Sequence, residues 1–254
     1  MIHNIITDTD PYLLHFCSGI KRYNGVLRYI REEWYKNNHF NNKINAFDIV
    51  SVMSSNIKES PILHQMGDDV IILGGHLSKR DYRKEGNITK LLLYVDYLKN
   101  NANKHTLFVD STDVIFVRHP HDLFRQYIGS GSKIIIGAEK RFSYFWKREN
   151  SDNFDSKDKT VKMILDSMNI NKTAWKSLNS GCIIGNNNLL LKFFRDVLDC
   201  YDENVRGKIN KKSDQSAIMY YLTKGCDLVS VDFDCVYFQS MHRLNVGEYE
   251  MLLK

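Results

Sequence analysis

Short apolar, β-prone runs alternate with segments of helical periodicity along most of the chain. Apolar residues recur at helical spacing in 88–98, with Asn87 as the expected N-cap, whereas KIIIGAE at 133–139 is typical of a fully buried strand. This alternation favours an α/β fold with a mainly parallel central sheet flanked by helices. The pattern predicts strands at 2–7, 46–53, 70–73, 106–109, 133–139, within 178–186, and at 228–231 and 236–238, and helices at 11–35, 88–98, 121–127, 189–201 and 214–222.

Two aspartates, Asp110 and Asp113, interrupt the apolar segment LFVDSTDVIFV at residues 107–117. Asp110 directly follows a predicted strand, and open α/β sheets bind ligands at the carboxyl ends of their strands. Carboxylates at positions i and i+3 of such a turn can lie on the same side, where they repel each other unless a cation lies between them. Oxygen ligands suit Mg²⁺ or Mn²⁺, and such an ion keeps positions open for diphosphate oxygens. The pair is therefore a candidate metal site.

The aspartate pair has two other interpretations. Asp110 could cap the turn while Asp113 pairs with a surface lysine. Phosphatases of the haloacid dehalogenase type also place an aspartate after an apolar strand, but they need Asp-x-Asp, whereas Ser111 and Thr112 separate the two carboxylates here. The spacing disfavours the phosphatase class without removing it.

Composition limits the choice of partner and compartment. The 254 residues are 43% hydrophobic and 26% charged, which is ordinary for one globular domain, and the net charge of +5 is scattered along the chain. The scattering argues against nucleic-acid binding, and an anionic small substrate fits the charge equally well. No apolar run approaches the roughly 20 residues that span a bilayer, and no secretory-signal pattern precedes Pro11. Five cysteines without CxxC spacing indicate reduced thiols, so we predict a cytoplasmic protein.

Five segments together resemble a known family. FVDSTDVIF, GSKIIIGAE, LNSGCIIG, DQSAIMYYL and VDFDCVYFQ occur in the same order as in the glycosyltransferase domain of the multifunctional procollagen lysyl hydroxylases. The collagen galactosyltransferases are a looser match. The resemblance spans about 70–239, most of the chain. The proline-poor composition also resembles that of proteins from giant viruses and other AT-rich genomes, which would place the protein in a viral factory.

The resemblance implies a GT-A-like fold, as a single domain over 1–254, that transfers a hexose from a UDP-sugar with Mn²⁺, or Mg²⁺, as cofactor. The implied reaction is glucosyl transfer to galactosyl-hydroxylysine of collagen or a collagen-like protein. Galactosyl transfer to hydroxylysine, or an inactive module that binds sugar nucleotides, are the alternatives. The resemblance also suggests a homodimer, and it implies neither nucleic-acid binding nor a membrane span.

Site residues follow from the matching motifs. Asp110 and Asp113 would bind the metal, and Asp214 and Asn179 are the candidates for a catalytic role at the anomeric carbon. Asp214 could instead be a helix N-cap, Asn179 part of a tight turn, and Lys90 part of a solvated helix face. The residues expected on the donor side are Thr7, Asp8, Lys90, Ser111, Glu139, Ser180, Gly181 and Gln215.

The chain departs from the family pattern at two places. The family has a tryptophan shortly after its glutamate-ending strand, where this chain offers Tyr144 and Trp146 on the acceptor side, since aromatic faces stack on sugar rings. The family also supplies a metal-binding histidine from a segment after the last motif. That segment is missing from this sequence, so the domain either lacks it or uses His242 as the third metal ligand.

Overall fold

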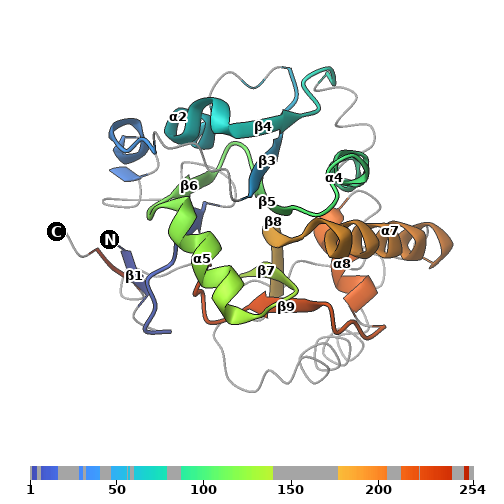
Figure 1. Ribbon diagram of the computed structural model, residues 1–254. Coiled ribbons are helices and arrows are strands. Elements are labelled where there is room, and N and C mark those ends of the chain that lie inside the picture. The colour runs from blue at the N-terminus through green and yellow to red at the C-terminus, as the bar shows by residue number, and fades with distance from the viewer. Residues whose placement is uncertain are drawn as a thin grey trace, which may run out of the picture.

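The computed structural model describes residues 2–4, 7–16, 29–30, 33–40, 47–55, 57, 60–78, 87–139, 177–204, 213–222, 224–241 and 249–251. Most of the described strands form one nine-stranded mixed sheet (Figure 1). Its order is β4 (Val70–Leu73), β3 (Asp48–Val52), β5 (His105–Asp110), β8 (Ser177–Asn186), β7 (Ile134–Glu139), β10 (Phe238–Ser240), β2 (Leu13–His15) and β6 (Val114–Phe116), and β9 (Val229–Asp232) pairs with β7.

Parallel pairing predominates in this sheet. Strand β3 runs parallel to β4 and β5, β7 runs parallel to β9 and β10, and β10 runs parallel to β2. Antiparallel pairing joins β8 to β5 and β7, and β6 to β2. Strands β1 (Ile2–Asn4) and β11 (Tyr249–Met251) form a separate antiparallel pair. The prediction of an α/β fold with a mostly parallel sheet flanked by helices is confirmed at this level.

Helices cover both faces of the sheet. Figure 1 shows α4 (Ile88–Lys99), α7 (Asn187–Asn204) and α8 (Asp214–Leu222) grouped on one side, with α2 (Pro61–Met66) and α5 (Pro120–Ser130) on the other. Short 3₁₀ helices, η2 (Trp34–Asn37) and η3 (Gly67–Asp69), lie near α2. Within the described residues, no helix combines the length and the apolar character needed to cross a bilayer.

Strand β5 is apolar on both sides because it separates two hydrophobic clusters. Phe108 packs with the α4–α7–α8 cluster, where its ring centroid lies 3.9 Å from that of Tyr94. Leu107 and Val109 point to the other face, into the cluster that includes residues of α2 and α5. A strand buried on both faces reads as a continuous apolar run, as the sequence does before Asp110.

The structure corrects three details of the predicted elements. The helix predicted over 11–35 is wrong at Leu13–His15, which is strand β2, and at Trp34–Asn37, which is 3₁₀. Residues 29–30 are helical, and 17–28 lies outside the described residues. The segment 178–186 contains no flanking turns, because Ser177–Asn186 is one continuous strand. Asn87 precedes α4 but makes no side-chain capping hydrogen bond.

Candidate metal centre and adjoining pocket

Three side chains, from the last residues of β2 and β5 and from the bend before β6, form a cluster that could hold a metal ion. One ligand atom each from His15, Asp110 and Asp113 lie within 4.8 Å of one another. His15 Nε2 is 3.4 Å from Asp110 Oδ2 and 3.4 Å from Asp113 Oδ1. The imidazole is 7% exposed and the two carboxylates are 31% and 20% exposed, so the cluster is reached from the carboxylate side. The site residues Asp110 and Asp113 do converge.

Strand pairing brings His15 to the aspartates. Asp110 is the last residue of β5, and the chain then bends into β6, which pairs antiparallel with β2. In that pairing His15 lies opposite Val114, and the backbone N–H of Phe16 donates to the carbonyl of Asp113 at 2.7 Å. The cluster therefore lies at the carboxyl ends of β5 and β2, where ligands of open α/β sheets bind.

Asn179 orients the imidazole of His15. Its Oδ1 lies 2.7 Å from His15 Nδ1 and also accepts the backbone N–H of Gly181 at 2.9 Å. Because a peptide N–H only donates, this oxygen is an acceptor, and His15 Nδ1 carries the proton that it receives. Nε2 then presents a lone pair toward the two carboxylates, which is how metal-binding histidines are held in proteins.

Lys90 connects the cluster to helix α8. Its buried Nζ lies 2.9 Å from Asp110 Oδ1 and 2.7 Å from Asp214 Oδ2, and it donates to the carbonyl of Ser180 at 3.3 Å. Burial alone would lower the pKa of Lys90, but Asp110 and Asp214 together raise it well above its ordinary value. Burial would likewise raise the pKa of Asp110, but Lys90, and His15 when its ring is protonated, hold it well below its usual range. The alternative of a solvated helix face for Lys90 is therefore wrong.

The charges favour a cation at the cluster. The carboxylates of Asp110 and Asp214 share one ammonium, that of Lys90, and Asp113 adds a third carboxylate, so the group carries a net charge of −2 when His15 is neutral. Like charges at this separation are costly unless a counter-ion lies among them. Two carboxylates and an imidazole nitrogen are a donor set that suits a divalent transition metal. The residues present therefore fit a divalent cation.

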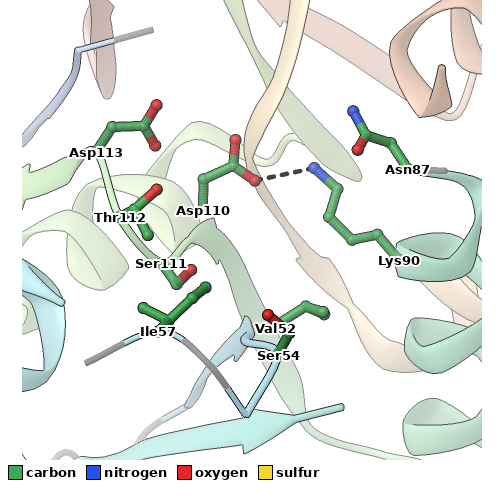
Figure 2. Close-up of a pocket in the computed structure, with 9 residues that line it drawn as sticks. All are labelled: Val52, Ser54, Ile57, Asn87, Lys90, Asp110, Ser111, Thr112 and Asp113. Atoms are coloured by element: carbon green, nitrogen blue, oxygen red, sulfur yellow. Dashed lines mark hydrogen bonds and ion pairs between the residues drawn. The ribbon is translucent and has the colours of Figure 1, made fainter. Parts of the chain in front are cut away.

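A pocket of about 220 Å³ opens beside the aspartates. Figure 2 shows Asp110 and Asp113 at one side of it, Lys90 facing Asp110 from α4, and Ser54 and Ile57 approaching from the segment after β3. The pocket thus combines an acidic edge with a wall that carries both apolar and hydroxyl groups. Its lining residues are Val52, Ser54, Ile57, Asn87, Lys90, Asp110, Ser111, Thr112 and Asp113.

Several other predicted site residues lie behind the cluster and outside that pocket lining. Glu139, at the end of β7, accepts from Asn179 Nδ2 at 3.0 Å and from Gln215 Nε2 at 2.8 Å. Asn179, Ser180 and Gly181 belong to strand β8, so the tight-turn alternative is wrong. Asp214 is the buried first residue of α8 and contacts Lys90, which gives it a partner beyond any capping role.

The structure does not bring Thr7 and Asp8 to the pocket lining. Thr7 Oγ1 lies 2.7 Å from Thr9 Oγ1, and the 94% exposed carboxylate of Asp8 lies 3.3 Å from His3 Nε2. The residues that follow β3, the strand paired with β5, line the pocket instead. The predicted residues Tyr144, Trp146 and His242 lie outside the described residues.

His15 is the member of the cluster that sequence reasoning missed. Its signal is a single polar residue inside the apolar run LLHF, which the predicted helix over 11–35 concealed. Comparisons of the whole sequence with protein-family models and with curated proteins find no match. The site's chemistry is therefore the basis for a functional assignment, together with the motif resemblance.

Proposed function

We propose that the protein is a metal-dependent glycosyltransferase of GT-A-like fold that takes a hexose from a UDP-sugar. The observation that carries the proposal is the His15–Asp110–Asp113 cluster at the carboxyl end of β5, on the edge of a pocket. Such a site can bind a divalent cation and leave its remaining positions to diphosphate oxygens. The order of the sequence motifs supports a sugar nucleotide as the source of that diphosphate.

The donor set favours Mn²⁺ over Mg²⁺. Mg²⁺ prefers oxygen ligands, whereas the imidazole nitrogen of His15 is a good ligand for transition metals. His15, Asp110 and Asp113 would hold the ion, and a cation bound there stabilises the charge of a departing nucleoside diphosphate. Lys90 keeps Asp110 ionised through its 2.9 Å contact, and so keeps that ligand available.

The pocket wall offers contacts to part of the nucleotide. Val52 and Ile57 offer an apolar surface to a base or ribose, and Ser54 offers a hydroxyl. The volume of about 220 Å³ is below the roughly 300–1,000 Å³ of most ligand pockets, so the described residues enclose part of a sugar nucleotide.

The roles of the two catalytic candidates differ in this geometry. Asn179 uses its side-chain oxygen for His15 and Gly181 and its amide for Glu139, so a positioning role suits it better than one at the anomeric carbon. Asp214 remains the candidate for stabilising positive charge on the sugar. The proposed reaction is glucosyl transfer to galactosyl-hydroxylysine of a collagen-like acceptor, with galactosyl transfer to hydroxylysine as the alternative.

Release of UDP tests the proposal. The protein is incubated with Mn²⁺ and UDP-glucose or UDP-galactose, with and without a galactosyl-hydroxylysine or hydroxylysine peptide. We expect acceptor-stimulated UDP release that Asp113→Asn abolishes and that Asp96→Asn, a change to an exposed aspartate of α4, leaves intact. Donor binding without turnover would instead identify an inactive sugar-nucleotide-binding module. Hydrolysis of phosphate monoesters without any response to UDP-sugars would contradict the proposal in favour of a phosphohydrolase.

A further inference from the structure

We propose that Glu139, acting through Asn179, fixes the tautomer of His15 that a bound metal requires. Both residues are positioning residues, because their described contacts reach the cluster through His15. The inference rests on the metal-binding part of the proposed function and is independent of which sugar nucleotide binds. It explains the burial of the Glu139 carboxylate, whose described hydrogen bonds are to Asn179 and Gln215 and not to His15, Asp110 or Asp113.

The direction of each hydrogen bond follows from Glu139. An ionised carboxylate only accepts, so the side chain that meets Glu139 Oε2 at 3.0 Å must present its NH₂ group, and that side chain is Asn179. The same amide must then turn its oxygen toward His15 Nδ1, 2.7 Å away. The imidazole can meet that oxygen only with an N–H, so Nδ1 is protonated and Nε2 faces Asp110 and Asp113 with its lone pair.

Two further donors hold this arrangement in place. The backbone N–H of Gly181 donates to Asn179 Oδ1 at 2.9 Å, which independently requires the oxygen to be on that side. Gln215 Nε2 donates to Glu139 Oε1 at 2.8 Å, which occupies the second carboxylate oxygen. A flip of the Asn179 amide would place NH₂ against the Gly181 N–H and oxygen against Glu139. Both contacts would be repulsive, so the orientation is strongly determined.

The opposite tautomer would disable the cluster. With the proton on Nε2, His15 would point an N–H at the position that a metal must occupy, and two carboxylates alone would remain as ligands. Groups that hold a ligating histidine from behind typically change metal affinity or activity by about 10- to 100-fold when they are removed. Loss of the Glu139–Asn179 pair should therefore lower the affinity for metal, and this can be measured without any turnover.

The same helix turn supports the cluster from a second direction. Gln215 follows Asp214 in α8, and Asp214 contacts Lys90, which contacts Asp110. The first turn of α8 thus reaches the histidine ligand through Glu139 and Asn179, and the aspartate ligand through Lys90. A metal bound at the cluster would close a continuous loop of polar contacts.

The test uses the full chain, Mn²⁺ alone as the probe, and two variants. Asn179→Ala removes the acceptor for His15 and should weaken Mn²⁺ binding by about 10- to 100-fold in calorimetry. The double variant Asn179→Asp with Glu139→Gln exchanges the two groups. Its aspartate still accepts from His15 and Gly181, and its glutamine donates to that aspartate and accepts from Gln215. It should bind Mn²⁺ at least as tightly as wild type. Asn188→Ala, which removes an exposed contact to Asn103, is the control and should change nothing.

The tautomer itself is read from ¹⁵N shifts of the His15 ring in metal-free protein at pH 8.5, assigned by comparison with His15→Gln. We expect Nδ1 to be protonated in wild type and in the double variant, and the proton to shift toward Nε2 in Asn179→Ala. A wild-type ring protonated on Nε2 and not on Nδ1 would overturn the inference, even if Asn179→Ala does not fold. So would a folded double variant that binds Mn²⁺ as weakly as Asn179→Ala.

The same measurements distinguish failure of this inference from failure of the proposed function. Wild-type protein that does not bind Mn²⁺ removes the metal site and this inference together. Variants that behave as expected in Mn²⁺ binding and ¹⁵N shifts, in a protein that never releases UDP, remove the transferase assignment and leave this inference standing.

Discussion

The imidazole ring of His15 lies so close to the backbone of Gly181 that a Cβ atom on residue 181 would be 2.2 Å from its Cε1 and 2.5 Å from its Nδ1. Cβ atoms essentially never approach other heavy atoms this closely, so only glycine leaves room for the ring. The requirement is one of space, and it ties the middle of β8 to a ligand on β2. Both strands are buried, so neither can move away without loss of packing.

Replacement of Gly181 by alanine should therefore displace His15 from the metal cluster. We expect Gly181→Ala to weaken Mn²⁺ binding by at least about 10-fold, the lower end of the range for changes behind a metal ligand. Calorimetric titration with Mn²⁺ measures the effect. Gly137→Ala is the matched control, because its Cβ would meet its nearest neighbours at an ordinary 3.5 Å. Equal Mn²⁺ affinities in Gly181→Ala and Gly137→Ala would show that Mn²⁺ binding does not depend on the position of the His15 ring.

Asp110 should be more important for metal binding than the groups behind His15, since it would be a direct ligand. Asp110→Asn keeps the shape of the side chain and removes its charge, while Lys90 retains Asp214 as a partner. We expect Mn²⁺ affinity to fall by more than the roughly 10- to 100-fold of an indirect change. Circular dichroism should show an intact fold. Wild-type affinity in this variant would exclude Asp110 as a ligand.

Lys90 should be important for stability as well as for the site. Lys90→Met leaves the buried carboxylate of Asp214 and the half-buried one of Asp110 without their shared cation, and loss of one partner of a buried ion pair costs about 3–5 kcal/mol. Urea denaturation measures this loss. Lys192→Met, which removes an exposed partner of Asp196, should leave the denaturation midpoint unchanged. The double variant Lys90→Met with Asp214→Asn should recover part of the stability, and its failure to do so would mean that the lysine packs rather than neutralises charge.

The aspartate pair was predictable because its signal is local. Apolar runs flank Asp110 and Asp113 so closely that the sequence shows where the strand ends. The carboxyl end of the strand is then the edge of the sheet at which the two carboxylates can converge. Most strands and helices were predictable for the same reason, since a strand buried on both faces is a continuous apolar run and a helix with one apolar face has apolar residues at helical spacing.

His15 was not predictable in this way, because its strand has no local signature. Strand β2 is three residues long, and its neighbours β10 and β6 come from distant parts of the chain. Thr7 and Asp8 illustrate the same limit. They follow the first strand in the sequence, but that strand pairs with β11 in a separate sheet, and β3 holds the position beside β5. Sequence order alone does not reveal which strand lies next to which.

Asp232 gives a pH-dependent prediction away from the metal cluster. Its carboxylate accepts the backbone N–H groups of Val236, Tyr237 and Phe238 at 2.7–2.8 Å, which holds the turn that leads into β10. Burial nevertheless outweighs these hydrogen bonds and raises the pKa of Asp232 from 3.8 to about 6. Between these two values folded Asp232 binds more protons than it does in the unfolded chain, so its contribution to stability falls as the pH rises through that window.

The expected loss at Asp232 is about 2 kcal/mol between pH 4 and pH 6 and about 3 kcal/mol over its whole titration, because each pKa unit corresponds to roughly 1.4 kcal/mol. Asp110, with its lowered pKa, contributes with the opposite sign, so the useful quantity is the difference in unfolding free energy between wild type and Asp232→Asn at each pH. We expect that difference to shift against wild type as the pH rises from 4 to 6 and to be constant above 7. Asp234→Asn, a change to the exposed neighbour, should show a much smaller shift. A difference that moves in favour of wild type would mean that the three backbone N–H groups stabilise the carboxylate more than burial destabilises it.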